Sequence, residues 1–440
     1  MRQQEEGTAR RTVRRILLLT SSFPRWEGDS ATPFVLHLAQ DLQALGIQVD
    51  VLAPHAPGAA RRERLGGLNV ERFRYLWPAS QETVCYGGGA LINLRDRRSN
   101  FAKVPFLVGA ELATTFGRLR GRRYDLLNAH WALPQGFVGA VARHVLNVPH
   151  VLTVHGGDVF ALQGRLMSRF KRLAFEGADA VTVNSSVTKQ AVLAVAPNAR
   201  DVRVIPMGIS DRPPVAEEVD AIRKRFRRGD GPLLAFAGRL VEEKGVEDLL
   251  LAMVGLVPRF PDTTAIVAGD GQHRPALEAV ATRLGVADRV FFVGWVQPAE
   301  VQTYLAAGDV LVAPSRRSPQ GWVEAQGLVV LEAMQVGVPV VASGSGGLTD
   351  IVVDGDTGLL VSEQAPEEIG AAVQRVCADP ELRARLVEHG RQMAARYSRS
   401  TSASSFADLF DSVVSRANAR RGLEPAATRP VGNRASGPGR

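Results

Sequence analysis

The sequence has little cysteine and no long apolar run. Only two of its 440 residues are cysteines, Cys85 and Cys377, and neither belongs to a CxxC pair. A disulfide scaffold and a cysteine-based zinc site are therefore not expected, and a reducing, cytoplasmic compartment fits. A bilayer-spanning helix needs about 18 or more consecutive apolar residues, and the sequence contains no such run.

The glycine-rich fingerprint of dinucleotide-binding proteins is also missing. That fingerprint, GxGxxG, follows the first strand of such a domain. Here the first apolar run, at 15–20, is followed by Ser21-Ser22-Phe23-Pro24. The sequence therefore argues against a dinucleotide-dependent oxidoreductase.

Negative charge is scarce in the first half of the chain. Residues 1–210 hold 27 Lys and Arg against 16 Asp and Glu, whereas residues 211–440 hold 26 against 29. Such asymmetry indicates an anionic partner for the first half, either a membrane or nucleic acid. The alternative is a solvated, arginine-rich surface.

Short apolar runs alternate with helical patterns along most of the chain. Strands are predicted at 15–20, 47–53, 126–130, 151–155, 180–184, 202–205, 233–237, 265–268, 290–293, 310–313, 338–342 and 359–361. Continuous apolar strands separated by helices predict parallel sheets that are covered on both faces. We therefore expect an α/β protein with two doubly wound, Rossmann-like domains.

Composition predicts where these domains begin and end. The first domain is expected at 13–210 and the second at 211–400, with a linker in the charged, proline-containing stretch 210–230. An amphipathic helix at 401–416 is expected to complete the first domain. Residues 417–440 are expected to form a disordered basic tail.

Residues 54–125 fit this alternation poorly. They hold thirteen Lys and Arg, interleaved with apolar residues such as Phe73, Trp77 and Phe101. A basic amphipathic stretch is typical of an element that lies on a membrane surface. The alternative is an ordinary elaboration that packs on its own domain.

Two cations follow the first strand of the second half. The loop reads Gly238-Arg239-Leu240-Val241-Glu242-Glu243-Lys244-Gly245 and leads into a predicted helix. Ligands of open α/β sheets bind beyond the carboxyl ends of the strands. Glycines allow close backbone approach, and Arg239 and Lys244 meet a helix N-terminus, so this loop predicts a phosphate or pyrophosphate site.

Two carboxylates follow a later strand of the same half. Glu324 lies before Gly327, at the entry to a helix, and Glu332 lies inside that helix among apolar residues. A buried carboxylate needs a partner. The two hydroxyls of a ribose are one such partner, and the alternative is a Glu on an exposed helix face.

The motifs G-R-x4-K-G and E-x7-E resemble those of glycosyltransferase family 4, a group of retaining enzymes with the GT-B fold. Further segments are similar to the family's motifs, and they lie at 22–25, 130–136, 153–158, 184–185, 205–209, 268–271, 292–296 and 346–361. The resemblance extends over roughly 15–400. It implies two Rossmann-like domains that face each other across a cleft.

The resemblance also implies roles for the matching residues. Arg239 and Lys244 would grip the donor pyrophosphate and neutralise the leaving nucleotide diphosphate, so neither a metal ion nor another cofactor is expected. No DxD motif stands where a metal would bind. Glu324 would contact the transferred sugar, and His155 would line the sugar pocket from the first domain. The donor-binding set would be completed by Gly28, Asp158, Gly238, Gly269, Gly271, Trp295, Val296, Gly327, Leu328, Val329 and, at the ribose, Glu332.

Three segments depart from the family pattern. The first loop, 25–33, has the single glycine Gly28 where the family often has a pair. The usual E-G-F-G is Glu324-Ala325-Gln326-Gly327, and Asp350 replaces a common Glu. None of these changes removes a charge that the chemistry requires.

The expected function is transfer of a sugar from a nucleotide-diphosphate sugar to an acceptor hydroxyl with retention, in the synthesis of a cell-surface polysaccharide, glycolipid or glycoconjugate. UDP is favoured over GDP as the nucleotide. The acceptor is expected to be a sugar, a lipid-linked sugar or another small molecule, and the basic half is expected to face an anionic membrane rather than nucleic acid. Alternatives are a non-catalytic nucleotide-sugar-binding protein, or another GT-B enzyme such as a nucleotide-sugar epimerase.

Overall fold

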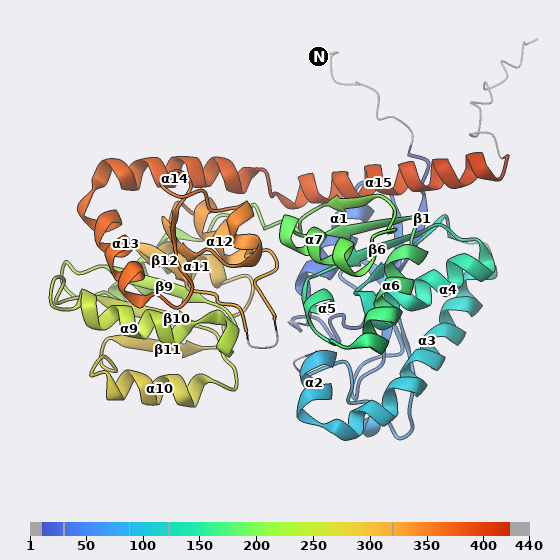
Figure 1. Ribbon diagram of the computed structural model, residues 1–440, viewed down its shortest axis with the longest axis horizontal. Helices are drawn as coiled ribbons and strands as arrows, with labels where there is room; N and C mark the ends of the chain where they lie inside the picture. The colour runs from blue at the N-terminus through green and yellow to red at the C-terminus, as the bar shows by residue number, and fades with distance from the viewer. Residues whose placement is uncertain (1–10, 30, 88, 122–123, 319–320, 423–440) are drawn as a thin grey trace, which may run out of the picture.

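The structure is a computed structural model that describes residues 11–29, 31–87, 89–121, 124–318 and 321–422. It contains two α/β domains, each built on its own sheet, and the domains lie side by side along the long axis of the molecule (Figure 1). This is the expected GT-B architecture of two Rossmann-like domains. None of the described helices is both long and apolar enough to cross a membrane.

The first sheet has eight strands in the order β3-β4-β2-β1-β5-β6-β7-β8. All neighbours pair in parallel except β3 and β4. The strands are β1 (Arg15–Leu19), β2 (Gln48–Pro54), β3 (Arg62–Leu65), β4 (Leu68–Phe73), β5 (Leu126–His130), β6 (His150–Val154), β7 (Ala180–Val183) and β8 (Val202–Val204). The helices around it are α1 (Pro33–Ala44), α2 (Ala90–Asp96), α3 (Val104–Leu119), α4 (Phe137–Leu146), α5 (Gly157–Phe160), α6 (Arg165–Gly177) and α7 (Ser186–Val195).

Both faces of the first sheet are buried, as its apolar strands require. Along β1, Ile16 and Leu18 belong to one hydrophobic cluster. Their neighbours Leu17 and Leu19 belong to another. Successive side chains of a strand point to opposite faces, so the apolar run 15–20 serves two cores at once.

The second sheet has six parallel strands in the order β11-β10-β9-β12-β13-β14. The strands are β9 (Leu233–Ala237), β10 (Thr264–Ala268), β11 (Val290–Gly294), β12 (Val310–Ala313), β13 (Val340–Ser343) and β14 (Leu359–Val361). The helices are α8 (Ala216–Phe226), α9 (Val246–Leu256), α10 (Arg274–Arg283), α11 (Val301–Ala307), α12 (Leu328–Gln335), α13 (Pro366–Ala378) and α14 (Pro380–Ala395). Strand order reverses between β9 and β12, so the loops after these two strands flank a topological switch point.

Two segments differ from their prediction. The stretch 210–230, expected as a linker, contains α8, whose Phe226 is buried in a small cluster with Leu233 and Ile266. Helix α15 spans Arg399–Arg420 instead of 401–416, because the Ser398 hydroxyl accepts a hydrogen bond from the Thr401 amide and caps the helix earlier. Of the predicted tail, 417–420 are therefore helical, and 423–440 lie outside the described residues.

Helix α15 returns from the second domain and packs on the first, along the upper edge of the molecule (Figure 1). Its Phe406 and Phe410 are fully buried in the same cluster as Ile16 and Leu18 of β1. The first domain thus takes part of its core from a helix that follows the second domain.

The chain passes between the domains twice, after β8 and between α14 and α15, and the two crossings are paired. The Ile209 amide donates to the Tyr397 carbonyl at 2.9 Å, and the Arg399 amide donates to the Ile209 carbonyl at 3.2 Å. A Cβ at Gly208 would come within 2.7 Å of Ser398 O. The crossings therefore touch backbone to backbone.

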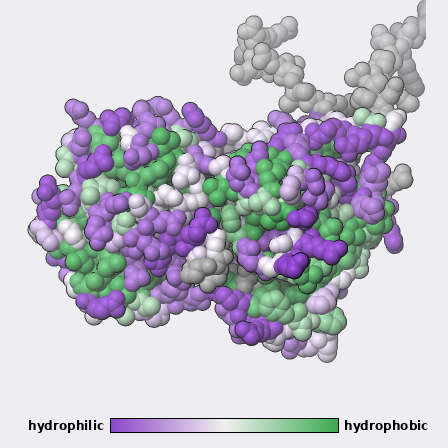
Figure 2. Space-filling model, viewed as in Figure 1, coloured by the Kyte–Doolittle hydropathy of each residue, from purple (hydrophilic) through white to green (hydrophobic). Residues whose placement is uncertain are grey.

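The segment after β4 contains α2, the short 3-10 turns η1 (Ala79–Gln81) and η2 (Arg98–Lys103), and α3. Helix α3 turns Leu107, Glu111, Thr115 and Leu119 into the domain. Its opposite side is exposed and carries no charge, with Pro105, Phe106, Gly109 and Ala113. Hydrophobic residues appear at the lower right of Figure 2, where Figure 1 places α2 and α3.

Candidate active site

The loops that follow β9, β10 and β11 are joined by backbone hydrogen bonds at glycine residues. The Gly238 amide donates to the Ala268 carbonyl at 2.9 Å, and the Gly269 amide donates to Gly294 at 2.8 Å. A Cβ at Gly269 would overlap the Gly238 carbonyl, and one at Gly271 would overlap the Leu240 carbonyl. Three of the predicted donor-binding glycines, at 238, 269 and 271, are thus brought to one edge of the sheet.

Trp295 and Val296 follow β11 at the same edge. Val296 is buried, whereas Trp295 is 54% exposed. The exposed indole is available to a planar group, and aromatic rings are worth about 0.5–1.5 kcal/mol in such a stack beyond the area they bury. The geometry is compatible with the predicted role of these two residues beside a base.

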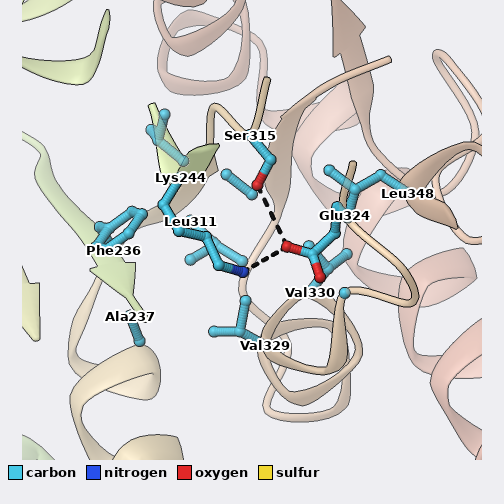
Figure 3. Close-up of a pocket in the computed structure, with 12 residues that line it drawn as sticks. Phe236, Ala237, Lys244, Leu311, Ser315, Glu324, Val329, Val330 and Leu348 are labelled. Carbon is cyan, nitrogen blue, oxygen red and sulfur yellow. Dashed lines mark hydrogen bonds and ion pairs between the residues drawn. The ribbon is translucent and has the colours of Figure 1, made fainter. Parts of the chain in front are cut away.

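Arg239 and Lys244 lie on the β9 loop, and Lys244 reaches the neighbouring β12 loop. Its ammonium donates to the Glu324 carboxylate, which also accepts from the Ser315 hydroxyl at 3.4 Å (Figure 3). Burial opposes the ionisation of Glu324, but Lys244 and Arg239 outweigh it and hold the pKa of this carboxyl below its usual range. An ion pair between Lys244 and Glu324 therefore joins the two loops at the switch point, and the positive charge of Arg239 acts on the same carboxylate.

Helix α12 begins beside this cluster. Its first turn follows Gly327, which adopts φ of +83°, and Val329 lines the hollow that also holds Lys244 and Glu324 (Figure 3). Leu328 packs against the cores of both domains. Glu332 lies one turn further, and burial raises its pKa to about 7. Its carboxylate makes no hydrogen bond within the part of the chain that the structure describes.

His155 lies directly after β6 of the first domain, next to a contact with the loop that holds Glu324. A Cβ at Gly156, the next residue, would overlap the Ala325 methyl group, so the two loops touch. The His155 ring lies against Trp131 and Phe34, at centroid distances of 4.8 and 5.0 Å. Burial lowers the pKa of His155 to about 3, so the imidazole is neutral at physiological pH.

The structure assigns Asp158 a supporting position. It is buried, and its carboxylate accepts hydrogen bonds from the Ala132 amide at 2.8 Å and the His155 amide at 3.2 Å. These bonds hold the two loops of the first domain that approach the second, and contact between Asp158 and a donor stays a prediction. Gly28 adopts φ of +83° in a separate turn, and a Cβ at this position would meet no atom of the described residues within 4 Å.

Two neighbours of the site were given no role from the sequence, although His130 opens the family-like segment 130–136. Ser315 contacts Glu324, and Nδ1 of His130 lies 3.0 Å from Nε2 of His155. A signal for His130 exists, because it ends β5 while His155 follows β6, and the two strands are adjacent. No group of three or more metal-ligating side chains is found in the described ranges.

Two family models match the chain. The model described as Glycosyltransferase Family 4 matches residues 31–212, and the one described as Glycosyl transferases group 1 matches residues 218–393. The two matches correspond to the two domains.

Individual proteins match over most of the chain. The 2-deoxystreptamine glucosyltransferase of Streptomyces kanamyceticus is 30% identical over 79% of this chain and 89% of its own length. The GDP-mannose-dependent alpha-(1-6)-phosphatidylinositol monomannoside mannosyltransferase of Mycolicibacterium smegmatis is 33% identical over 60% of this chain and 70% of its own. Among solved structures, the sucrose-phosphate synthase of Thermosynechococcus elongatus superposes with a TM-score of 0.75 at 26% identity, covering 92% of this chain and 100% of that one.

The order of the two family matches, the identity to curated glycosyltransferases and the two-sheet architecture agree with one another. The chain belongs to glycosyltransferase family 4 and is a glycosyltransferase with the GT-B fold.

Proposed function

We propose that the protein transfers a sugar from a nucleotide-diphosphate sugar to an acceptor hydroxyl, with retention of configuration and without a metal ion. The observation that carries the proposal is the ion pair of Lys244 with Glu324 at the switch point of the second sheet, where the charge of Arg239, on the same loop as Lys244, also acts on the Glu324 carboxylate. The donor would lie on this domain, and the acceptor would enter from the side of His155.

The cations supply the charge that a leaving diphosphate needs. When the bond between C1 of the sugar and the β-phosphate oxygen breaks, negative charge develops on the phosphate. Arg239, Lys244 and the N-terminus of α9, which starts at Val246, are placed to stabilise it. Stabilisation that grows in the transition state accelerates the reaction, so a metal is not required.

Retention is supported by the groups on the acceptor side. An inverting transfer needs a side-chain base opposite the leaving group. The pKa of about 3 makes His155 a weak base, and the Asp158 oxygens are occupied by backbone amides. The acceptor hydroxyl would instead attack C1 from the side of the departing phosphate, whose oxygen takes the proton while the new bond forms.

Substitution of the two cations tests the proposal. Arg239→Ala and Lys244→Ala should each lower turnover by roughly 100- to 1,000-fold, the usual cost of one lost charge-stabilising group. Lys224→Ala, an exposed cation on α8, serves as the control and should keep full activity with the same melting temperature. Near-normal transfer by the double variant Arg239→Ala/Lys244→Ala would overturn the proposal.

The donor nucleotide can be identified by ligand-linked stabilisation. UDP is expected from the sequence, whereas one relative is by its name GDP-mannose-dependent. A ligand that binds only the folded state raises the melting temperature in proportion to the logarithm of its concentration over Kd. In a panel of UDP- and GDP-sugars, the donor should therefore be the one that raises the melting temperature most. Analysis of the product formed from that donor then distinguishes sugar transfer from epimerisation and from binding without reaction.

We also propose an anionic membrane as the partner of the first domain, with a lipid-linked acceptor at its surface. We define the docking face as Phe101, Pro105, Phe106, Gly109 and Ala113. Phe101 is 54% and Phe106 59% exposed, and the face holds no charged residue.

Basic residues lie close to the docking face in the sequence. From Arg74 to Arg120 there are seven Lys and Arg against three Asp and Glu, and the exposed residues at 95–98 are three Arg and one Asp. Trp77, 87% exposed, precedes η1, which Lys103 ties to η2 by donating to the Gln81 carbonyl at 3.0 Å. An apolar face with basic residues close by in the sequence suits an anionic bilayer, and one relative is by its name a phosphatidylinositol monomannoside mannosyltransferase. The protein would then act in glycolipid or cell-surface polysaccharide synthesis, in the cytoplasm at the inner face of the membrane.

Co-sedimentation with vesicles tests the membrane proposal. The protein should co-sediment with vesicles that contain phosphatidylglycerol, and the bound fraction should fall as the salt concentration rises. It should not co-sediment with vesicles of pure phosphatidylcholine. Phe101→Ser/Phe106→Ser should lose the binding, whereas Leu251→Ser/Val254→Ser, at exposed apolar positions of α9, should keep it. Failure to bind anionic vesicles at low salt would contradict the membrane proposal. The basic residues of the first domain would then form an ordinary solvated surface.

A further inference from the structure

A row of hydrogen-bonded side chains leads from the middle of β5 to His155. Nδ2 of Asn128 lies 3.0 Å from the Thr153 hydroxyl and 3.2 Å from the Val151 carbonyl. Its Oδ1 lies 3.0 Å from Nε2 of His130, and Nδ1 of His130 lies 3.0 Å from Nε2 of His155. Asn128 and His130 are fully buried, and neither has been given a role so far.

The direction of each bond in the row is fixed by chemistry. A backbone carbonyl only accepts, so the Val151 carbonyl orients the Asn128 amide with its nitrogen toward β6 and its oxygen toward His130. Amide oxygen also only accepts, so the hydrogen of that bond is on Nε2 of His130.

The row then determines the hydrogen on His155. Burial lowers the pKa of His130 well below its usual value, so its imidazole is neutral. A neutral imidazole with a hydrogen on Nε2 has a lone pair on Nδ1, and this lone pair accepts from His155. The Nε2 of His155 must therefore carry its hydrogen, and Nδ1 of the neutral His155 keeps a lone pair.

We propose that Asn128 and His130 are positioning residues that hold His155 in one tautomer, so that its Nδ1 accepts a hydrogen bond from a hydroxyl of the bound sugar substrate. Nδ1 of His155 has no hydrogen-bond partner among the described residues. Only the identity of the hydroxyl rests on the proposed transfer function, whereas the tautomer is a property of the protein alone.

The tautomer can be measured without any substrate. In the full chain with 15N-labelled histidine, long-range 1H–15N spectra should show His155 protonated at Nε2 only, with its signals assigned by their loss in His155→Gln. His130→Gln retains an acceptor oxygen and should keep this pattern. His130→Met removes the acceptor and should give an average of the two tautomers. A His155 protonated at Nδ1, or charged at neutral pH, would overturn the proposal.

Kinetics then test the hydroxyl contact. His130→Met should lower kcat/KM by about tenfold, the effect of one misdirected hydrogen bond, and His130→Gln should recover most of that loss. Donor analogues that each lack one hydroxyl should include one for which wild type and His130→Met have the same kcat/KM. If the loss persists with every deoxy donor and with a deoxy acceptor, the contact between His155 and a sugar hydroxyl is wrong, even where the spectra agree.

Discussion

Glu332 carries a carboxyl group whose pKa burial raises to about 7. A carboxylate accepts hydrogen bonds from both hydroxyls of a ribose, whereas a carboxylic acid must donate one hydrogen itself. The resemblance to family 4 assigns the ribose to this residue. The charge state of Glu332 is therefore expected to control donor affinity near neutral pH.

We predict that the donor Kd rises as pH falls below 7. A ligand that needs the ionised form binds about tenfold more weakly for each pH unit below the pKa of the free protein, and the dependence levels off above it. Glu332→Gln should weaken binding and flatten this pH dependence. Calorimetric titration with the donor between pH 5.5 and 8.5 measures both.

Glu300→Gln is the matched control, because Glu300 is an exposed carboxylate of the same domain. It should reproduce the wild-type dependence. A wild-type Kd that does not change between pH 6 and 8 would contradict the prediction.

At the residue scale, the sequence predicted the types of groups but not their pairings. Arg239, Lys244 and Glu324 were identified from their motifs and their places after predicted strands. The direct bond from Lys244 to Glu324 was not, because it depends on β9 and β12 being neighbours. Strand order is a property of the folded sheet that a linear pattern does not contain. The hydrogen-bonded row from Asn128 to His155 was missed for the same reason, because it depends on β5 and β6 being neighbours.

At the element scale, the buried parallel strands were predicted closely, because apolar runs such as 233–237 are covered on both sides. The hairpin of β3 and β4 was not predicted. Strand β3 has one buried residue, Leu65, and three partly or fully exposed charged ones, so it lacks an apolar run. Helix α8 was taken for a linker because, of its eleven residues, only Phe226 is buried.

Helix α15 allows a prediction about the first domain. Phe406→Ala should lower the free energy of unfolding of this domain by about 3–5 kcal/mol, because a fully buried ring leaves a cavity. Urea unfolding followed by near-ultraviolet circular dichroism measures the change. Ser415→Ala, at an exposed position of the same helix, should have no effect beyond about 0.5 kcal/mol. An equal loss of unfolding free energy in both variants would contradict the prediction, because it would show that the packing of Phe406 is not what stabilises the domain.

At the scale of the whole molecule, the domains touch where Gly156 meets Ala325, the residues that follow His155 and Glu324 in the sequence. Besides Gly156 and Ala325, the Ser186 amide donates to the Asp350 carboxylate at 2.6 Å. Asp350 was noted from the sequence only as a replacement for the family's Glu. The structure places it at the contact between domains.

We predict that Gly156→Ala lowers kcat/KM by at least tenfold by keeping the domains apart. The added methyl group would overlap Ala325, and the φ of +94° at this position disfavours any residue with a Cβ. Gly58→Ala separates the two causes, because Gly58 has φ of +81° but open space around its Cβ position. It should cost stability without loss of activity. Steady-state kinetics and small-angle scattering of both variants check the prediction, and a compact, fully active Gly156→Ala protein would contradict it.

The return of α15 to the first domain has a consequence for the order of events during synthesis. A ribosome makes residues 13–207 of that core before the second domain and residues 403–414 after it. The nascent first domain therefore emerges with its sheet complete but part of its apolar surface uncovered. The whole second domain is translated before the missing helix arrives. The first domain can thus be completed only after the second domain has been made, and in this interval its uncovered apolar surface is open to aggregation.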